Sequence, residues 1–187
     1  MRLNFAAIIP IFAALLTTAC REESITRARV PKDEDGAASV AAAPASRPKG
    51  LRWELPDGWK EIPSSGMRLA TFVPPGGLKT EATVVALPGD SGGELANANR
   101  WRGQIGLPPT DAAGMAAART TVATKAGRAA VYDFTSAGPG RTRLIAAVLS
   151  AGGTTWFFKL RGDAAATESA REGFLALIKG LTPDASK

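Results

Sequence analysis

The sequence predicts an α+β fold, a sandwich with a mostly antiparallel sheet of about seven strands covered by two main helices. Three observations lead to this prediction. Seven runs within residues 51–161 either alternate apolar with polar residues or concentrate β-branched and aromatic residues, as strands do. The runs of the second half are joined by short connections containing glycine, which is typical of antiparallel hairpins. Two further segments carry apolar residues at helical spacing.

The first half of the domain is expected to hold three strands and a helix. The strands cover residues 51–55, 67–73 and 81–87, and each is followed by a turn containing proline and glycine. The hydrophobic period then changes over residues 93–105. A helical wheel places Trp101 on the apolar face of that segment, so we expect a helix there.

The second half is expected to be a meander of strands followed by a last helix. The four strands of the meander are residues 119–125, 128–136, 141–151 and 154–161. Asp163 stands where an N-cap is needed for a helix over residues 164–179, and Gly180 follows as its C-cap. The core face of this helix is expected to consist of Ala170, Phe174, Leu177 and Ile178.

The N-terminus indicates export. Arg2 precedes an apolar run over residues 3–16, which is too short to span a hydrocarbon core of about 30 Å and contains Pro10. The run has the length of a signal-peptide core. We therefore divide the chain into a signal peptide over residues 1–20, a tether over 21–50 and one α+β domain over 51–187.

The stretch Leu16-Thr17-Thr18-Ala19-Cys20 resembles the lipobox of bacterial lipoproteins, in a relaxed form because the leucine lies one place further back than usual. The resemblance implies that Cys20 becomes the acylated first residue of the mature chain and carries palmitate, which anchors it to a membrane. Arg21 follows in place of an aspartate, which favours the outer membrane, facing the periplasm. The alternative is an ordinary cleaved signal with a cysteine at its edge by chance.

Residues 21–50 mix opposite charges and then run through alanine, serine and proline. Such a composition cannot bury enough apolar surface to order itself, so we expect a disordered linker. Thirty flexible residues have a root-mean-square reach of roughly 30 Å, which would let the domain stand away from the membrane.

Composition removes many kinds of functional site. The chain has no histidine and one cysteine, which excludes the common zinc and haem sites and the Ser–His–Asp triad. No phosphate loop, dinucleotide fingerprint or metal-ligand spacing occurs, so neither a cofactor nor a metal is expected. The formal net charge of +6 is not concentrated in a dense basic run, which argues against nucleic acid as a partner.

The stretch Gly89-Asp90-Ser91-Gly92-Gly93 is identical to the sequence around the nucleophile of chymotrypsin-like proteases. That nucleophile needs a histidine as its base, and this chain has none. A Ser–Lys dyad would need Lys79 or Lys125 beside the serine. We interpret the stretch as coincidental, with Asp90 or Ser91 capping the following helix, and we expect no enzyme activity.

The domain also resembles a known family. The opening Leu55-Pro56-x-Gly58-Trp59, the helix after the third strand, the long-stranded meander and the terminal helix with Phe174 resemble the PsbP-like fold over residues 51–182. The resemblance implies a non-catalytic domain that docks on larger protein assemblies.

The first helix carries the candidate binding patch. Asn97, Arg100 and Gln104 align opposite Trp101 on the helical wheel, with Arg102 at the rim, and this cluster of donors suits a carboxylate or a backbone edge on a protein partner. The alternative is a polar face that only meets water. The oligomeric state has no signal in the sequence.

The sequence therefore predicts a membrane-tethered binding or accessory module of the bacterial envelope. The alternative function is a small-molecule or lipid-binding lipoprotein with an apolar pocket between sheet and helix. Four aromatic residues would line that pocket: Trp53, Phe72, Trp156 and Phe158.

Overall fold

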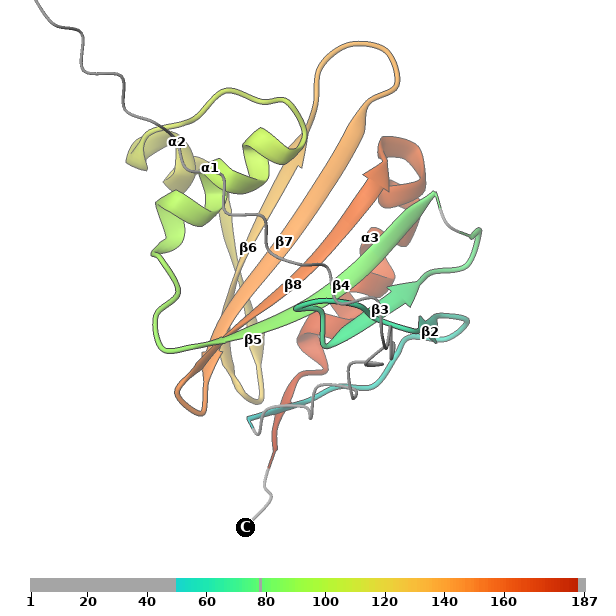
Figure 1. Cartoon of the computed structure of the whole chain (residues 1–187), viewed down its shortest axis with the longest axis vertical. Helices are drawn as coiled ribbons and strands as arrows, with labels where there is room; N and C mark the ends of the chain where they lie inside the picture. Colours follow the sequence, from blue (N-terminus) through green and yellow to red (C-terminus); the bar gives the residue numbers. More distant parts are fainter. Residues whose placement is uncertain (1–49, 78, 185–187) are drawn as a thin grey trace, which may run out of the picture. The chain divides into compact units, whose positions relative to one another are not determined.

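The protein is described by a computed structural model that covers residues 50–77 and 79–184 (Figure 1). Seven strands form one antiparallel sheet in the order β2-β3-β4-β8-β7-β6-β5. Their bounds are β2 Lys60–Ile62, β3 Ala70–Val73, β4 Thr80–Pro88, β5 Arg119–Thr124, β6 Gly127–Thr135, β7 Thr142–Ala151 and β8 Thr154–Asp163. The predicted fold class is confirmed, and the meander β5 to β8 follows the sequence closely.

The strand expected over residues 51–55 does not belong to this sheet. Its first two residues form β1 (Leu51–Arg52), which pairs with β9 (Thr182–Pro183) in a separate two-stranded ribbon. Trp53 follows β1 in a loop and packs against Phe72 and Phe158 of the core. The apolar residue that suggested a longer strand is therefore a loop residue partly buried against the core. The seventh strand of the sheet is instead the unpredicted β2.

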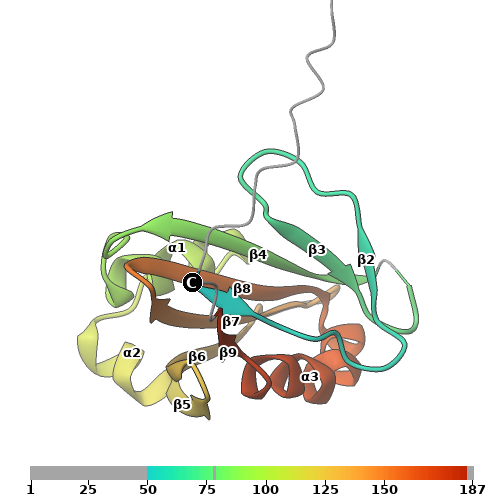
Figure 2. The same cartoon turned by 90° about the horizontal axis from the view of Figure 1, so that it is seen from below.

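Helices lie on both faces of the sheet. Helix α1 (Glu94–Gln104) and the short α2 (Ala112–Ala118) pack on one face, over β6 and β7. Helix α3 (Ala164–Lys179) packs on the other. Figure 1 shows α1 in front of the sheet and α3 behind it, and Figure 2 shows the same layers from below. No helix of the described residues lies in front of β3 and β4.

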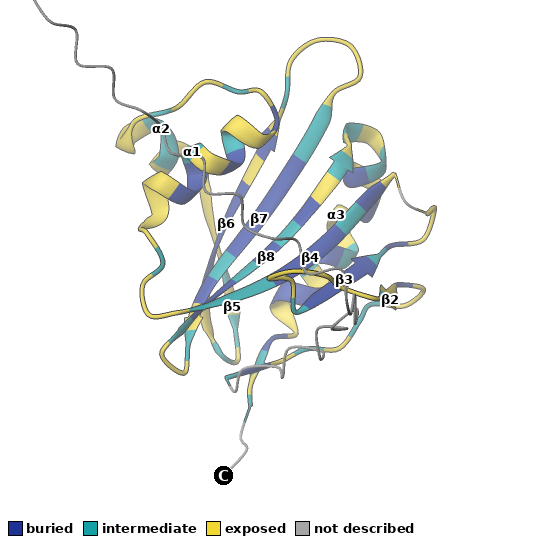
Figure 3. Ribbon diagram, viewed as in Figure 1, coloured by how far each residue is buried: buried dark blue, intermediate teal, exposed yellow. Residues whose placement is uncertain are grey.

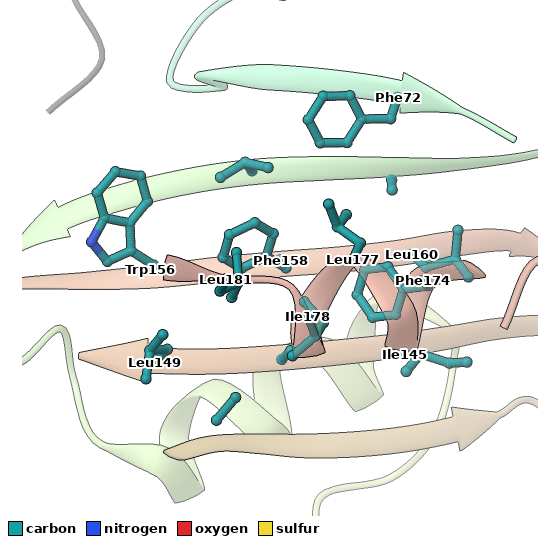
Figure 4. Close-up of a cluster of buried hydrophobic side chains, with 14 of the residues drawn as sticks. Phe72, Ile145, Leu149, Trp156, Phe158, Leu160, Phe174, Leu177, Ile178 and Leu181 are labelled. Atoms are coloured by element: carbon teal, nitrogen blue, oxygen red, sulfur yellow. The ribbon is translucent and has the colours of Figure 1, made fainter. Parts of the chain in front are cut away.

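The larger core fills the space between the sheet and α3 (Figure 4). Alternate residues of β8 point into it, and the predicted core face of α3 meets them, as the alternation of a strand and the 3.6-residue period of a helix require. The fully buried side chains drawn there include Phe72, Trp156, Phe158, Leu160, Phe174, Leu177 and Ile178.

A second core lies beneath α1. Trp101 and Ile105 pack against Tyr132, Phe134 and Leu144 of the sheet, which confirms that Trp101 belongs to the core face. Figure 3 shows the result, because the outward side of α1 is exposed while the strands beneath it are buried.

The helix caps agree with the sequence at α3 and differ at α1. Asp163 accepts hydrogen bonds from the backbone N–H groups of Ala165 and Ala166, as predicted. Helix α1 begins after Gly93, whose φ of 73° is open to glycine, and no side chain caps it. The prediction that Asp90 or Ser91 is the N-cap is therefore wrong.

Candidate functional site

Asn97 does not lie on an exposed face, contrary to the prediction. Its side chain is 4% exposed, and its Nδ2 donates to the carbonyl oxygens of Ser91 at 2.8 Å and Gly93 at 2.9 Å. The physical reason is that α1 begins without a side-chain N-cap. Glycines there offer no side-chain cap, and the amide of Asn97 folds back to hold the loop that enters the helix. It is a structural residue.

The two arginines of the predicted patch lie nearer the surface. Arg100 is exposed, and its Nη1 donates to Asn97 Oδ1 at 2.8 Å. The Nε of Arg102 donates to the carbonyl oxygen of Pro108 at 2.8 Å, and its guanidinium lies 5.4 Å from the centre of the Phe134 ring. Arg102 therefore fastens the turn after α1. Partner binding by Arg100 and Arg102 stays a prediction.

Gln104 connects the end of α1 to the centre of the sheet. Its Oε1 accepts a hydrogen bond from Lys159 Nζ at 3.1 Å, and its backbone oxygen accepts one from Arg161 Nη2 at 3.1 Å. Lys159 and Arg161 are two residues apart on β8, so both project on the face that carries α1. Gln104, a residue of the predicted patch, thus accepts hydrogen bonds from two cations that lie 55 and 57 residues further along the chain.

The strand register extends this cluster across the sheet. Lys159 stands opposite Thr83 of β4, and Thr83 stands opposite Thr71 of β3. The next row places Arg161 opposite Glu81, whose carboxylate pairs with Arg68 at 3.2 Å. We use the name Lys159 site for the charged and amide side chains gathered here, namely Arg68, Glu81, Gln104, Lys159 and Arg161.

The electrostatics of Lys159 are unusual for a sheet residue. Partial burial lowers the pKa of its ammonium below the ordinary value, and the positive charges of Arg161 and Arg68 lower it further, while Glu81 acts in the opposite direction. Among the described residues no carboxylate lies within ion-pair distance of Lys159 Nζ, whose one hydrogen-bond partner is the neutral amide of Gln104. An ammonium has three donors, so two are available to an acceptor from outside.

Little in the sequence pointed to this site. Arg68 lies in the loop before β3, whereas Lys159 and Arg161 lie on β8, and each is an ordinary residue for a strand or loop. Only the register of β3, β4 and β8 brings them together. The alternating run of β8 did place Lys159 and Arg161 on one face, which was the single available signal.

The residues of the protease-like stretch form a turn. Ser91 is half-buried, and its hydroxyl donates to the carbonyl oxygen of Pro88 at 3.5 Å. No contact of Ser91 with a lysine is present in the described chain, so the Ser–Lys arrangement has no geometric support. The described residues also contain no group of three or more potential metal ligands.

The rings that would line an apolar pocket pack against one another. Trp53 meets Phe72, Trp156 and Phe158 edge to face, with ring centroids 6.2, 6.1 and 5.8 Å apart. These separations are those of close aromatic packing and leave no room for a ligand between the rings. The alternative function therefore loses the site that the sequence analysis assigned to it.

The N-terminal predictions fall outside the described residues. Cys20, the signal peptide over residues 1–20 and the tether up to residue 49 all lie there. Within the described part, no helix is long and apolar enough to cross a bilayer.

Comparison with known proteins gives fold-level similarity. No protein-family model matches the sequence, and no curated protein is significantly similar to it. Three solved structures resemble the fold. CyanoP, the PsbP protein of Synechocystis, is 10% identical with a TM-score of 0.46, over 78% of this chain and 99% of its own. LpqN, involved in cell envelope biogenesis of Mycobacterium tuberculosis, is 16% identical with a TM-score of 0.43, over 71% and 82%.

The third is a Bacteroides thetaiotaomicron protein that is 13% identical with a TM-score of 0.45 over 71% of this chain. This chain spans only 44% of that protein's length. Similarity at this level concerns the fold alone.

Proposed function

We propose that this chain is a tethered, non-catalytic binding module of the bacterial envelope, and that its domain docks on a protein partner through the Lys159 site. The observation that supports the proposal is the state of Lys159. Its half-buried ammonium is under the influence of the positive charges of Arg161 and Arg68, and its one hydrogen-bond partner among the described residues is a neutral amide. A carboxylate on a partner would supply the missing counter-charge.

The energetics favour such a partner. Part of the cost of desolvating Lys159 is already met when the domain folds, so a carboxylate that reaches it forms a stronger pair than one at a fully exposed lysine. Arg161 adds a guanidinium two residues away on the same face. An acidic side chain presented by a partner would therefore be recognised by two cations at once.

The surroundings suit a protein surface. Met67, next to Arg68 in the chain, is 70% exposed and is one of the two large apolar side chains exposed in the described chain, together with Leu95 on α1 at 36%. Methionine and arginine are enriched in protein interfaces, where a flexible thioether adapts to the opposing surface. An exposed apolar side chain beside a charged cluster is the composition of a small docking surface.

The rest of the proposal concerns location. A lipid on Cys20 would hold the chain at the membrane, with the outer membrane favoured, and residues 21–50 would give the domain freedom to meet a membrane-associated assembly.

Site-specific photo-crosslinking in cells tests the docking surface. A crosslinking residue is placed at Met67, at Arg100 or, as a control, at Glu172 on the exposed side of α3. We expect an adduct of the same mass from Met67 and Arg100, no such adduct from Glu172, and loss of the adduct when Lys159→Glu is added. Folding of each variant is checked by its melting temperature.

Two results would contradict the proposal. One is an adduct that forms equally from all three positions, which would indicate unspecific proximity. The other is an adduct from Met67 and Arg100 that survives Lys159→Glu in a folded protein, which would show that the ammonium does not recognise the partner.

A further inference from the structure

A hollow of about 590 Å³ lies at the C-terminal end of α3, away from the Lys159 site. It is formed where the β1–β9 ribbon, the turn between β5 and β6 and the last turn of α3 meet. The charged side chains around it are Arg52, Lys125 and Lys179, with Glu54 as the single carboxylate.

The cations around this hollow are not neutralised by ion pairs within the described chain. Arg52, Lys125 and Lys179 make no ion pair and no side-chain hydrogen bond with another described residue. The C-terminus of α3 carries a partial negative charge of roughly half a unit, which favours Lys179 but cannot balance three cations. With Glu54 included, the lining keeps a surplus of positive charge, which suits an anion.

The kinds of donor point to a phosphate group. Arg52 supplies a planar guanidinium that bonds two oxygens at once, and the lysines supply point charges. Thr182, which stands opposite Arg52 in the β1–β9 register, adds a hydroxyl group to the lining. Guanidinium, ammonium and hydroxyl donors around one concavity are the usual set for a tetrahedral anion.

The position of the hollow indicates where the phosphate comes from. Arg52 is the second residue of β1, and residue 50 is the first described residue of the chain that leads back to the predicted anchor at Cys20. Strand β1 pairs with β9, and both lie at the lower end of the domain in Figure 1. The predicted tether would join the domain at this end, so a membrane contact here would need no further length of tether.

We propose that this hollow seats the phosphate headgroup of an anionic lipid and so docks the tether end of the domain on the membrane surface. The inference rests on the proposed function in one respect, because it assumes that the chain is anchored to a membrane. It is independent of the partner and of the Lys159 site. Basic residues near an anionic bilayer are attracted to it individually, and a concave arrangement adds the geometry for one headgroup.

Amine labelling of the full lipoprotein tests the site, because the lysines of the chain include matched controls. The chain is reconstituted in vesicles of phosphatidylcholine alone or of phosphatidylcholine mixed with phosphatidylglycerol, and the acetylation of each lysine is followed by mass spectrometry. We expect labelling of Lys125 and Lys179 to slow about fivefold in the anionic vesicles. Labelling of Lys60 and Lys79, which are exposed elsewhere, is expected to stay unchanged.

A second arm distinguishes the sources of phosphate. Inorganic phosphate added to the phosphatidylcholine sample is expected to leave the labelling of Lys125 and Lys179 unchanged. Equal protection by free phosphate would overturn the lipid assignment in favour of a soluble anion. Equal labelling of all four lysines in both kinds of vesicle would overturn the site altogether.

Two variants test the hollow separately from the lipid anchor. Arg52→Glu is expected to abolish the protection of Lys125 and Lys179, whereas Lys60→Glu is expected to preserve it, with both melting temperatures close to that of the unmodified sequence. Flotation of the protein with phosphatidylcholine vesicles reports the anchor alone. Failure of flotation would count against the tethered function, and normal flotation without protection would count against the hollow.

Discussion

Asn97 fastens the start of α1 from inside the protein. Its amide donates to two loop carbonyls, and its oxygen accepts from Arg100. Replacing it removes these three partly buried hydrogen bonds, so Asn97→Ala should lower the free energy of unfolding by about 2 kcal/mol. Arg100→Ala, on the exposed side of the same contact, should cost about 0.5 kcal/mol or less.

Urea unfolding of the two variants checks this prediction. Asn97 and Arg100 are the two partners of one hydrogen bond, so the two variants compare the loss of its buried partner with the loss of its exposed partner. A similar small effect of both substitutions would mean that the helix start holds without Asn97, and that its burial serves another purpose.

Tyr132 gives the domain a second testable feature at the level of one residue. Its hydroxyl donates to Glu94 Oε2 at 2.6 Å, and Arg119 Nε donates to the same oxygen at 3.1 Å. The bond to Tyr132 lowers the pKa of Glu94, with burial acting against it and Arg119 assisting. Burial first, and then the bond to Glu94, raises the pKa of Tyr132 to about 12.

These shifts predict how the effect of Tyr132→Phe depends on pH. The substitution should cost about 1 kcal/mol at neutral pH, because Glu94 loses its partner. The folded chain holds the Tyr132 proton more tightly than the unfolded chain, so this contribution is present below pH 10 and is lost as the pH rises towards 12. Glu94 acts in the opposite sense, since its contribution is present above pH 4.5 and is lost as the pH falls below it.

The difference in unfolding free energy between the original protein and Tyr132→Phe should therefore be largest near neutral pH and should narrow at both extremes. Urea unfolding over a pH series measures it. A difference that stays constant from acid to alkaline pH would show that the Tyr132–Glu94 bond does not carry the stabilisation.

At the scale of helices, two glycines allow the effect of helix propensity on stability to be measured apart from the effect of packing. Gly103 of α1 has open space where a Cβ would lie, whereas a Cβ on Gly173 of α3 would lie 2.8 Å from Trp59 Nε1. Gly103→Ala should raise the free energy of unfolding by about 0.5–1 kcal/mol, because alanine loses less backbone entropy in a helix. Gly173→Ala should lower it by about 1–2 kcal/mol, because α3 must move away from Trp59.

Thermal unfolding of the two variants measures both effects in one experiment. Equal stabilisation by both alanines would show that the Trp59 ring gives way easily and that α3 does not depend on close approach at this point.

The elements that the sequence predicted well are those in which local pattern and tertiary packing agree. Strands β6, β7 and β8 are long and bounded by glycine turns, and α3 has both a capping residue and an apolar face. The missed elements are short. Strand β2 has three residues, and the seven residues of α2 form an alanine-rich run in which the structure buries none. The Asp111 cap of α2 was its one visible signal.

Only one residue of the Lys159 site, Gln104, was predicted from the sequence. Gln104 was correctly placed on α1, but its contacts with Lys159 and Arg161 depend on how α1 lies across the sheet. Asn97 was misplaced because the helical wheel assumes that polar residues face water. That assumption fails where a polar side chain folds back to hydrogen-bond the loop that enters its own helix.

For the whole molecule, the two basic regions have different chemistry and different positions. The Lys159 site lies on the sheet face that carries α1, and its central cation is partly desolvated. The hollow lies at the tether end, and its cations are exposed. A membrane contact at the hollow would leave the Lys159 site free, so a single domain could hold a lipid surface and a protein partner at the same time.

A residue that is retained for binding is expected to lower the stability of the folded domain. Lys159 allows a direct test of this expectation. Because its pKa is lower in the folded chain than the ordinary 10.5, the folded state holds this proton less tightly than the unfolded state does. The charge therefore destabilises the domain at neutral pH, and this cost disappears as the pH rises to 10.5 and beyond. Lys159→Met keeps the length of the side chain and removes the charge, so it should raise the free energy of unfolding by about 1 kcal/mol at neutral pH.

The same variant should lose the crosslinked adduct from Met67 and Arg100, because the partner carboxylate no longer meets a cation. Gain of stability together with loss of binding is the expected sign of a residue retained for function. Loss of stability in Lys159→Met would mean that the hydrogen bond to Gln104 outweighs desolvation. Lys159 would then be a structural link between β8 and α1, and the docking surface would have to be sought elsewhere on the domain.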